Sequence, residues 1–268
     1  MKRTVCAIGL AIWLGLMAGG ATADEPSLSL AKAVRKDEAP TLKAHPDVAR
    51  RTGDVLTISF HGKAVASFND LWKDCEGYET CSLWAFDGLI SLTPAPGKRE
   101  TYVVVMHEQG EGRQYGLISR SGDITWLDDY PVASPDGRYV VIGEAEGEGD
   151  GFLSVIDWTS AGHRSSADFA QTACDPGKWQ GTTLKLVCSD ESVKSYFALA
   201  DLRQSAVDTF TLRETSAADS QTRAPIHDPA FHQKEVSARI MAPAPQTAKE
   251  KADDDAYYIN AGYKRLTP

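Results

Sequence analysis

The feature that most restricts the fold is a strand-like segment that occurs twice. Tyr-Val-Val-Val at residues 102–105 returns as Tyr-Val-Val-Ile at residues 139–142, 37 residues later. At the same offset, Gly-Glu-Gly at 110–112 matches Gly-Glu-Gly at 147–149, and Tyr115 matches Phe152. β-Branched and aromatic residues favour strands, and a glycine-containing tip between two such runs favours a hairpin. The matches therefore predict one repeated unit, which consists of a strand, an acidic tip and a second strand.

Further strand signals surround this repeat. Runs at 55–60 and 63–68 flank His61-Gly62 and predict a hairpin, and residues 82–92 are apolar enough for a strand pair. A weaker third copy has a strand at 184–188, a polar tip at 189–194 and a return strand at 196–201, and 208–212 adds another strand. A period of about 40 residues built from short strands is typical of propeller blades. The sequence predicts an all-β domain over residues 54–214.

One turn carries a family resemblance. Ser134-Pro135-Asp136-Gly137-Arg138 and the apolar residues after it resemble the S-P-D-G hairpin of β-propeller repeats, such as those of the Tol-system periplasmic propeller. Proline presets φ, glycine accepts positive φ, and the next strand starts at once. Residues 175–179 and 96–98 resemble degenerate copies. The resemblance implies a small propeller-like array of about four to five antiparallel blades, and a β-sandwich or an open meander is the alternative.

The N-terminus predicts export. Lys2 and Arg3 precede an apolar stretch at 5–17, and small residues then end in Ala21-Thr22-Ala23. A charged start, an apolar middle and an A-x-A site are the parts of a signal peptide, and the apolar stretch is shorter than the roughly 20 residues that a membrane span needs. We expect cleavage after residue 23, a soluble protein in the periplasm or secreted, and no stable membrane insertion afterwards.

The remaining chain divides by composition. Residues 24–53 predict a polar, disordered arm with a short helix at 28–36, and residues 215–268 predict a linker and tail. Aromatic residues at 256–260 and 263–266 favour a final strand, which could dock on the first blade and close a ring. The tryptophans of the exported chain are expected to pack in the core.

Four cysteines remain after cleavage: Cys75, Cys81, Cys174 and Cys188. An even number in an exported chain indicates disulfides. Of the three connectivities, the local pairs Cys75–Cys81 and Cys174–Cys188 are favoured. A zinc site is the weaker alternative, because no C-x-x-C or H-x-x-x-H spacing is present.

Charge limits the partners. Without Lys2 and Arg3, the chain has 26 basic residues against 37 acidic residues and a net charge of −11. Nucleic acid and anionic membranes require a basic face, so both are excluded as partners. The charge favours a basic protein partner.

Metal binding is the chemistry that the sequence supports best. Glu144, Glu146, Glu148 and Asp150 crowd one predicted tip, and Glu111 lies with His107 and Glu108 at the equivalent tip one repeat earlier. If neighbouring blades bring these tips together, their oxygen atoms could bind Ca²⁺. The alternative is a solvated acidic turn, since the D-x-D-x-D-G pattern of a calcium loop is missing. Taken singly, the histidines His61, His107, His163, His227 and His232 are expected at the surface.

The sequence contains no G-x-S-x-G elbow, no P-loop and no G-x-G-x-x-G after a strand. No catalytic or cofactor-binding residue is assigned, and the prediction leans away from an enzyme. The leading hypothesis is a periplasmic binding or scaffold module for a protein or small ligand. A small hydrolase or lyase whose site assembles only in three dimensions, an inhibitor or immunity-type protein, and a structural envelope protein remain open.

Overall fold

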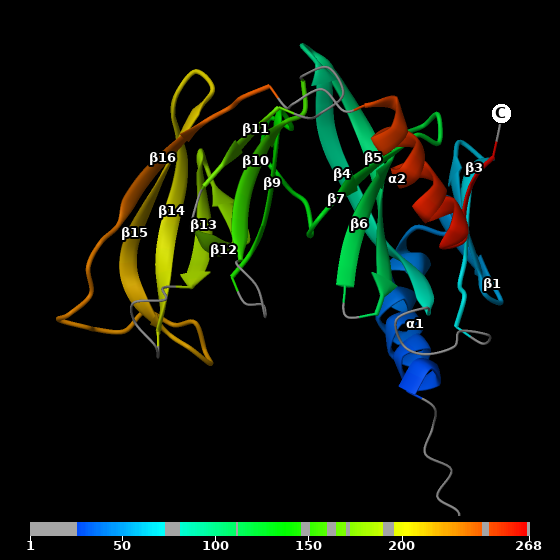
Figure 1. The fold of residues 1–268 in the computed structure, drawn as a ribbon, viewed down its shortest axis with the longest axis horizontal. Coiled ribbons are helices and arrows are strands. Elements are labelled where there is room, and N and C mark those ends of the chain that lie inside the picture. The colour runs from blue at the N-terminus through cyan, green and yellow to red at the C-terminus, as the bar shows by residue number, and fades with distance from the viewer. Residues whose placement is uncertain are drawn as a thin grey trace, which may run out of the picture.

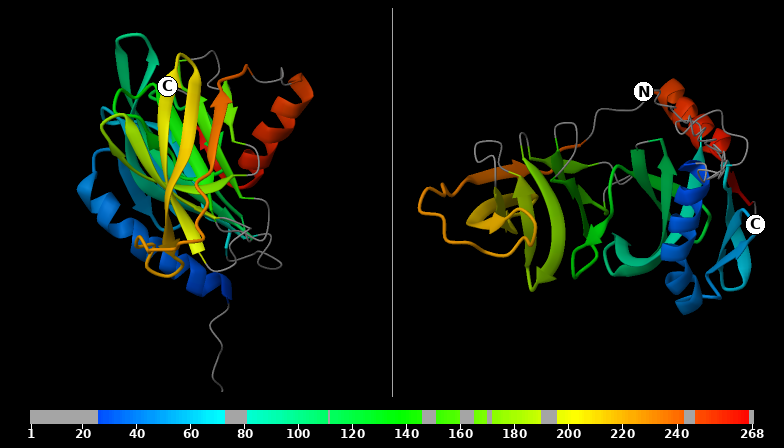
Figure 2. Two further views of the ribbon diagram at one scale, coloured as in Figure 1. Left: turned by 90° about the vertical axis from the view of Figure 1, so that its left-hand side faces the viewer. Right: turned by 90° about the horizontal axis from the view of Figure 1, so that it is seen from below.

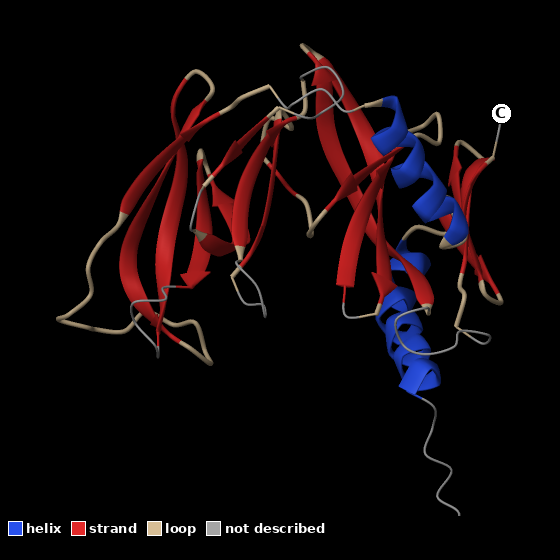
Figure 3. Ribbon diagram, in the orientation of Figure 1, coloured by secondary structure: helices blue, strands red, loops and turns tan. Residues whose placement is uncertain are grey.

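The computed structural model describes residues 26–72, 81–110, 112–145, 151–159, 165–169, 172–189, 196–242 and 247–266. In this part of the chain, most residues form strands of four antiparallel sheets, and none of the sheets closes on itself (Figures 1 and 3). The all-β prediction is therefore confirmed at the level of fold class, with two helices added.

Each sheet is a meander of strands that follow one another in the chain, apart from one C-terminal strand. Sheet A contains β1 (Ala49–Thr52), β2 (Val55–Phe60), β3 (Lys63–Asn69) and β17 (Tyr263–Arg265). Sheet B contains β4 (Ser82–Ala95), β5 (Lys98–Gln109), β6 (Gly112–Ile118) and β7 (Ile124–Leu127). Sheet C contains β8 (Val132–Ala133), β9 (Tyr139–Glu144), β10 (Phe152–Asp157) and β11 (Ser166–Asp168). Sheet D contains β12 (Ala173–Gln180), β13 (Thr183–Ser189), β14 (Tyr196–Ala206), β15 (Thr209–Asp219) and β16 (Glu235–Arg239).

The sheets stand in a row in the order A, B, C and D, with sheets A and D at opposite ends of an elongated molecule (Figures 1 and 2). Three apolar clusters fill the spaces between neighbouring sheets. They include Leu56, Trp84 and Val105 between A and B, Tyr102, Val140 and Trp158 between B and C, and Val141, Leu186 and Phe210 between C and D. Because both faces of sheets B and C are covered, their central strands contain runs of consecutive buried apolar residues, 102–106 in β5 and 139–142 in β9, rather than strict alternation.

The repeated segments occupy equivalent places. β5 and β9 are each the second strand of a four-stranded sheet, and each pairs with the next strand in the chain. Tyr102 meets Trp158 of the following sheet edge to face at 5.4 Å, and Tyr139 meets Phe210 of sheet D in the same way at 4.9 Å. Val103 and Val140 point to the preceding sheet in both cases. The prediction that these two segments form equivalent strands is confirmed.

The S-P-D-G segment forms the turn that it predicts, between β8 and β9. The Ser134 hydroxyl accepts from Tyr139 N at 2.9 Å, and the Asp136 carboxylate accepts from Arg138 N at 3.0 Å. Gly137 has φ of +72°, and a Cβ there would lie 2.9 Å from Ser91 O. The turn thus needs glycine both for its dihedral angle and for its close approach to sheet B.

Of the other local predictions, some are confirmed and some are wrong. The hairpins around 61–62 and 96–97 are confirmed, and so is the pair at 184–188 and 196–201. Residues 82–92 are wrong as a strand pair, because they lie within the single long strand β4, which bulges between Phe86 and Gly88. Residues 175–179 are wrong as a turn, because they form a bulge inside β12. A bulge accommodates the glycine and the proline without ending the strand.

The disordered N-terminal arm is wrong for residues 26–52. Helix α1 (Pro26–Ala44) lies against β4 and buries Ala31 and Val34, and β1 follows it in sheet A. Two arginines and three carboxylates from both sides of this contact pair with one another: Arg35, Glu38, Arg51, Asp54 and Asp70. These ion pairs hold part of the polar segment in place, and composition alone cannot distinguish such paired residues from solvated ones.

The C-terminal tail is also more ordered than predicted. β16 lies within residues 215–268, and the expected strand at 256–260 is wrong, since those residues end helix α2 (Ala248–Asn260). A capping box between Thr247 and Glu250 starts this helix. β17 does pair with β3 of the first sheet. It completes sheet A but closes no ring, because sheet D lies at the other end of the row (Figure 1).

The disulfide Cys174–Cys188 is confirmed and joins directly opposed residues of β12 and β13. Cys81 is also disulfide-bonded, and its predicted partner Cys75 lies outside the described residues. The predicted signal peptide lies outside them as well. Neither described helix is long and apolar enough to cross a membrane.

Candidate functional site

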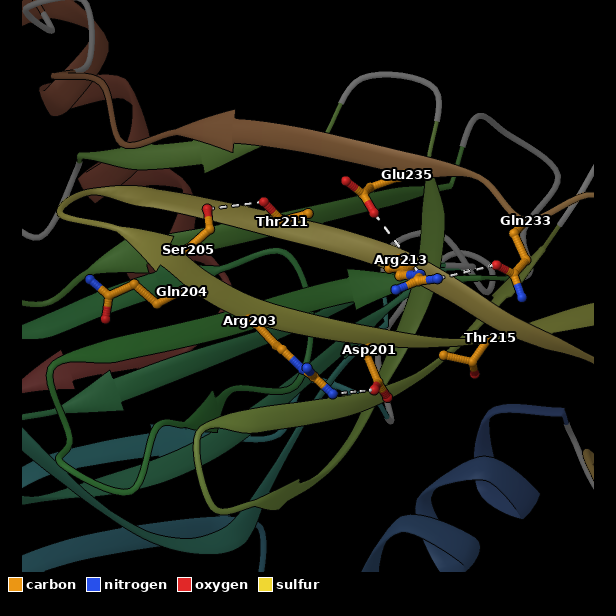
Figure 4. A pocket seen from close by; sticks show the side chains of 9 residues that line it. All are labelled: Asp201, Arg203, Gln204, Ser205, Thr211, Arg213, Thr215, Gln233 and Glu235. Atoms are coloured by element: carbon orange, nitrogen blue, oxygen red, sulfur yellow. Dashed lines mark hydrogen bonds and ion pairs between the residues drawn. The ribbon is translucent and has the colours of Figure 1, made fainter.

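The outer face of sheet D carries a polar groove. Along β14 and β15, Leu202 and Phe210 point into the core, whereas the residues between the core positions point outward. The groove has a volume of about 610 Å³ (Figure 4). It is lined by Asp201, Arg203, Gln204, Ser205, Thr211, Arg213, Thr215, Gln233 and Glu235.

The charged side chains at this groove are not equally well paired. Asp201 accepts from Lys185 Nζ at 2.5 Å and from Arg203 Nη2 at 3.0 Å, so one buried carboxylate is shared by two cations. Arg213 has only long contacts, 3.5 Å from Nη2 to Gln233 Oε1 and 4.0 Å from Nε to Glu235 Oε2. The groove lining thus holds two arginines and two carboxylates, Arg203 and Arg213 against Asp201 and Glu235, so it is locally balanced although the chain as a whole is acidic.

The arginines are the groups that could bind a ligand. The Arg203 and Arg213 side chains are each 62% exposed, and strand pairing spaces them along neighbouring strands. Hydroxyl groups lie beside them, since Thr211 Oγ1 contacts Ser205 Oγ at 3.0 Å and Ser237 Oγ at 2.8 Å. A guanidinium with free N–H groups binds carboxylates or phosphates in a bidentate manner. The groove can thus bind an anionic group without rearrangement of the sheet.

The predicted calcium site remains a prediction. Glu144 lies exposed at the end of β9, whereas Glu111, Glu146, Glu148 and Asp150 lie outside the described residues. Among the residues that are described, no three His, Cys, Asp or Glu side chains form a group that could hold a metal ion. Glu108 pairs with Arg113 at 3.1 Å.

His107 corrects the expectation of surface histidines. Its ring is buried and stacks on Trp84 at 4.0 Å, and Nε2 lies 2.8 Å from Ser82 Oγ. Ser82 donates its single hydroxyl proton to Ala261 O at 2.8 Å, so Nε2 carries a proton and donates to Ser82. Burial lowers the pKa of His107 to about 4. This serine is not activated by the histidine, and the pair connects sheet B to the end of α2.

A second group of perturbed residues lies where sheets B and C meet. Burial raises the pKa of Asp87, at the bulge of β4, and that of Asp129, just after β7. Glu144 and Asp175 raise the pKa of Asp129 further. Burial also raises the pKa of Tyr115 to about 12. In the sequence Asp129 simply follows Asp128, and the opposing sheet that buries it cannot be inferred from that pair.

The buried ion pairs of α1 hold elements together. Arg51 donates from Nε to Glu38 Oε2 at 2.6 Å and from Nη1 to Asp70 Oδ2 at 2.8 Å. Asp70 Oδ1 accepts from Trp84 N at 3.0 Å, and burial raises the pKa of Asp70 against the opposing effect of Arg51. The cluster joins α1, sheet A and sheet B. Glu38 and Asp70 are buried and Arg51 is nearly so, so these pairs act within the core of the contact rather than at its surface.

Fold and groove together define an all-β protein of four stacked meander sheets with a polar groove on its terminal sheet. A scan against protein-family models, a search of curated proteins and a search of solved structures each returned no match to this chain.

Proposed function

We propose that the chain is an exported binding module that recognises anionic groups of a partner through the outer face of sheet D. The observation that carries the proposal is the pair of exposed guanidinium groups at this groove, those of Arg203 and Arg213 on neighbouring strands. The net charge of the chain favours a basic partner for the molecule as a whole. The groove lining is balanced rather than acidic, with two arginines and two carboxylates, and a bound group senses local charges within about a Debye length.

The architecture suits such a role. We propose that sheets A to D are propeller-type repeats in an open row, with β17 supplying the last strand of the first repeat. The equivalent placement of β5 and β9 and the S-P-D-G turn before β9 support this relationship. A rigid sheet face positions side chains more accurately than a loop does. Export to the periplasm, as the N-terminal sequence predicts, would expose this face to other envelope proteins.

A binding measurement tests the proposal. The probe is a fluorescent hexaglutamate peptide at low salt, compared with a hexalysine peptide and a neutral peptide. Removal of a charge-assisted contact costs about 1.5–3 kcal/mol, so Arg213→Gln and Arg203→Gln should each weaken hexaglutamate binding about tenfold or more. Arg50→Gln, an exposed arginine on β1 in sheet A, is the matched control and should have no effect.

Two results would contradict the proposal. The first is the absence of saturable hexaglutamate binding to the wild-type protein. The second is a loss of binding in Arg50→Gln as large as the loss in the groove variants. Stronger binding of hexalysine would instead place recognition on the acidic part of the surface.

A further inference from the structure

The free edge of sheet D is a regular strand with unused backbone groups. β16 is the last strand of the sheet and pairs only with β15 among the described residues. Glu214 N donates to Lys234 O at 2.9 Å, and Ile240 N donates to Asp208 O at 2.7 Å. Antiparallel strands direct the backbone of alternate residues to the same side. The N–H and C=O groups of Glu235, Ser237 and Arg239 therefore point away from β15.

Met241 is the next residue whose backbone groups point away from β15, and it pairs with another strand through them. Met241 N donates to Ser166 O at 2.8 Å, and Ser166 N donates to Met241 O at 3.1 Å. No further pair between β11 and β16 follows in the described part of the chain. A groove of about 470 Å³ opens along this edge, lined by Asp168, Ser237, Arg239 and other residues.

The edge has only part of the usual protection against pairing. Native proteins blunt free edges with short strands, charged side chains, proline, bulges or a covering element. β16 is short and carries Glu235 and Arg239, and β11 lies beside it, but it has neither a proline nor a bulge. The opposite edge of sheet D has both Pro176 and a bulge in β12, whereas β16 keeps an unbroken register from residue 235 to residue 239. An exposed edge of this kind is suited to the addition of another strand.

The side chains identify the strand that fits. The sequence Glu-Val-Ser-Ala-Arg is complementary to itself when two copies run antiparallel about Ser237. Glu235 then faces Arg239 of the second copy on the outer side, twice by symmetry. On the inner side, Val236 faces Ala238 of the second copy, and both residues already pack against the core. Opposite charges across a strand pair stabilise it.

We propose that β16 forms a two-fold interface with β16 of a second copy of this chain, so that sheet D continues from one copy into the other. The pairing adds about six backbone hydrogen bonds, from three outward residues on each copy. It is limited to residues 235–239, because Ser166 occupies the outward groups of Met241. In the dimer, Glu235 turns to the second copy and leaves Arg213 without its 4.0 Å contact. The proposal does not depend on the anion-binding function.

Sedimentation velocity of the chain from residue 24 onward tests the interface. An interface of one strand pair is small, so we expect a monomer–dimer equilibrium between about 1 µM and about 200 µM. Glu235→Arg and Arg239→Glu each place like charges opposite one another twice, and each should raise the dimer dissociation constant about tenfold or more. The double variant restores opposite charges and should dimerise as the wild type does.

Mixing provides the sharper test. A protein with Glu235→Arg and a protein with Arg239→Glu are complementary across a two-fold axis, so the mixture should form a heterodimer although each variant alone does not. Arg50→Glu, which reverses an exposed charge on β1 at the other end of the molecule, is the control and should dimerise normally. Far-ultraviolet circular dichroism and the melting temperature of each variant confirm that it is folded.

The proposal is overturned if the wild-type protein stays monomeric over this range. It is also overturned if the dimer persists in both single variants, or if neither the double variant nor the mixture restores association. Hydrogen exchange gives an independent readout. The amide protons of Ser237 and Arg239 should become protected as the concentration rises, and unchanged exchange in a dimer would place the interface elsewhere.

Discussion

Acidification should destabilise this protein through His107. Burial holds the pKa of the folded-state imidazole at about 4, against 6.5 for an unperturbed histidine. Because the folded pKa is the lower one, the unfolded chain takes up the proton first as the pH falls. The contribution of neutral His107 to the free energy of unfolding is complete above about pH 6.5 and is lost progressively toward about pH 4. From those two pKa values, the free energy of unfolding should fall by about 2 kcal/mol between about pH 7.5 and about pH 5.

Urea denaturation of the wild type and of His107→Gln over this range measures the effect. Glutamine can still donate to Ser82 Oγ but does not titrate. The comparison between the two proteins is essential, because burial raises the pKa of Asp70, Asp87 and Asp129. These carboxyls stabilise the fold as the pH falls, with the opposite sign, and they do so in both proteins.

The difference in unfolding free energy between wild type and variant should therefore change by about 2 kcal/mol across the range. The same pH dependence in both proteins would refute the inference that His107 is buried and neutral. A histidine that titrates near its ordinary pKa in the folded protein, measured by nuclear magnetic resonance, would refute it as well.

Three further substitutions test the packing. Arg51→Met leaves two buried carboxylates with fewer partners and should lower the free energy of unfolding by about 3–5 kcal/mol in urea titrations. Tyr258→Ala removes a ring that stacks on Trp126 at 3.6 Å, and it should cost about 3 kcal/mol and shift the tryptophan emission. Gly137→Ala forces a side chain to positive φ against Ser91 O and should cost about 1–3 kcal/mol, seen as a lower melting temperature.

Neighbouring positions supply the controls. Arg50→Met removes an exposed cation from the same strand as Arg51, and Gly181→Ala changes a glycine with φ of +61° and no atom within 4 Å of the added Cβ. Arg50→Met should change stability by less than about 0.5 kcal/mol. Gly181→Ala should lower the free energy of unfolding only by the cost of placing alanine at positive φ. An equal loss of stability at Gly137 and Gly181 would therefore argue against the contact with Ser91.

Local sequence predicted the units of this fold well. The Tyr-Val-Val runs, the turn at 134–138 and the hairpins around 61–62 and 96–97 all depend on residues close together in the chain. Glycine and proline act on their own dihedral angles, and β-branched runs act over one strand. Such preferences operate without the rest of the molecule. Predictions failed where a distant partner was decisive, as for α1, which depends on Arg51 and Asp70.

The candidate site was beyond sequence prediction for the same reason. Arg203 and Arg213 are ordinary outward residues of two strands, and they share a groove only because β14 pairs with β15 in one register. His107 was expected at a solvated tip, yet α2 covers it from a segment about 150 residues further along the chain.

The amino-acid sequence by itself determined that the chain forms short antiparallel strands in repeated units, because periodicity and turn chemistry are local properties. The tertiary structure alone decided that these units stand in an open row, that the N-terminal helix is longer than predicted and docks on the sheets, that the C-terminal segment becomes a helix, and that arginines of sheet D share a face. Those outcomes depend on burial and on pairing between distant residues. The free energies of this burial and pairing arise only when segments that are distant in the chain come into contact.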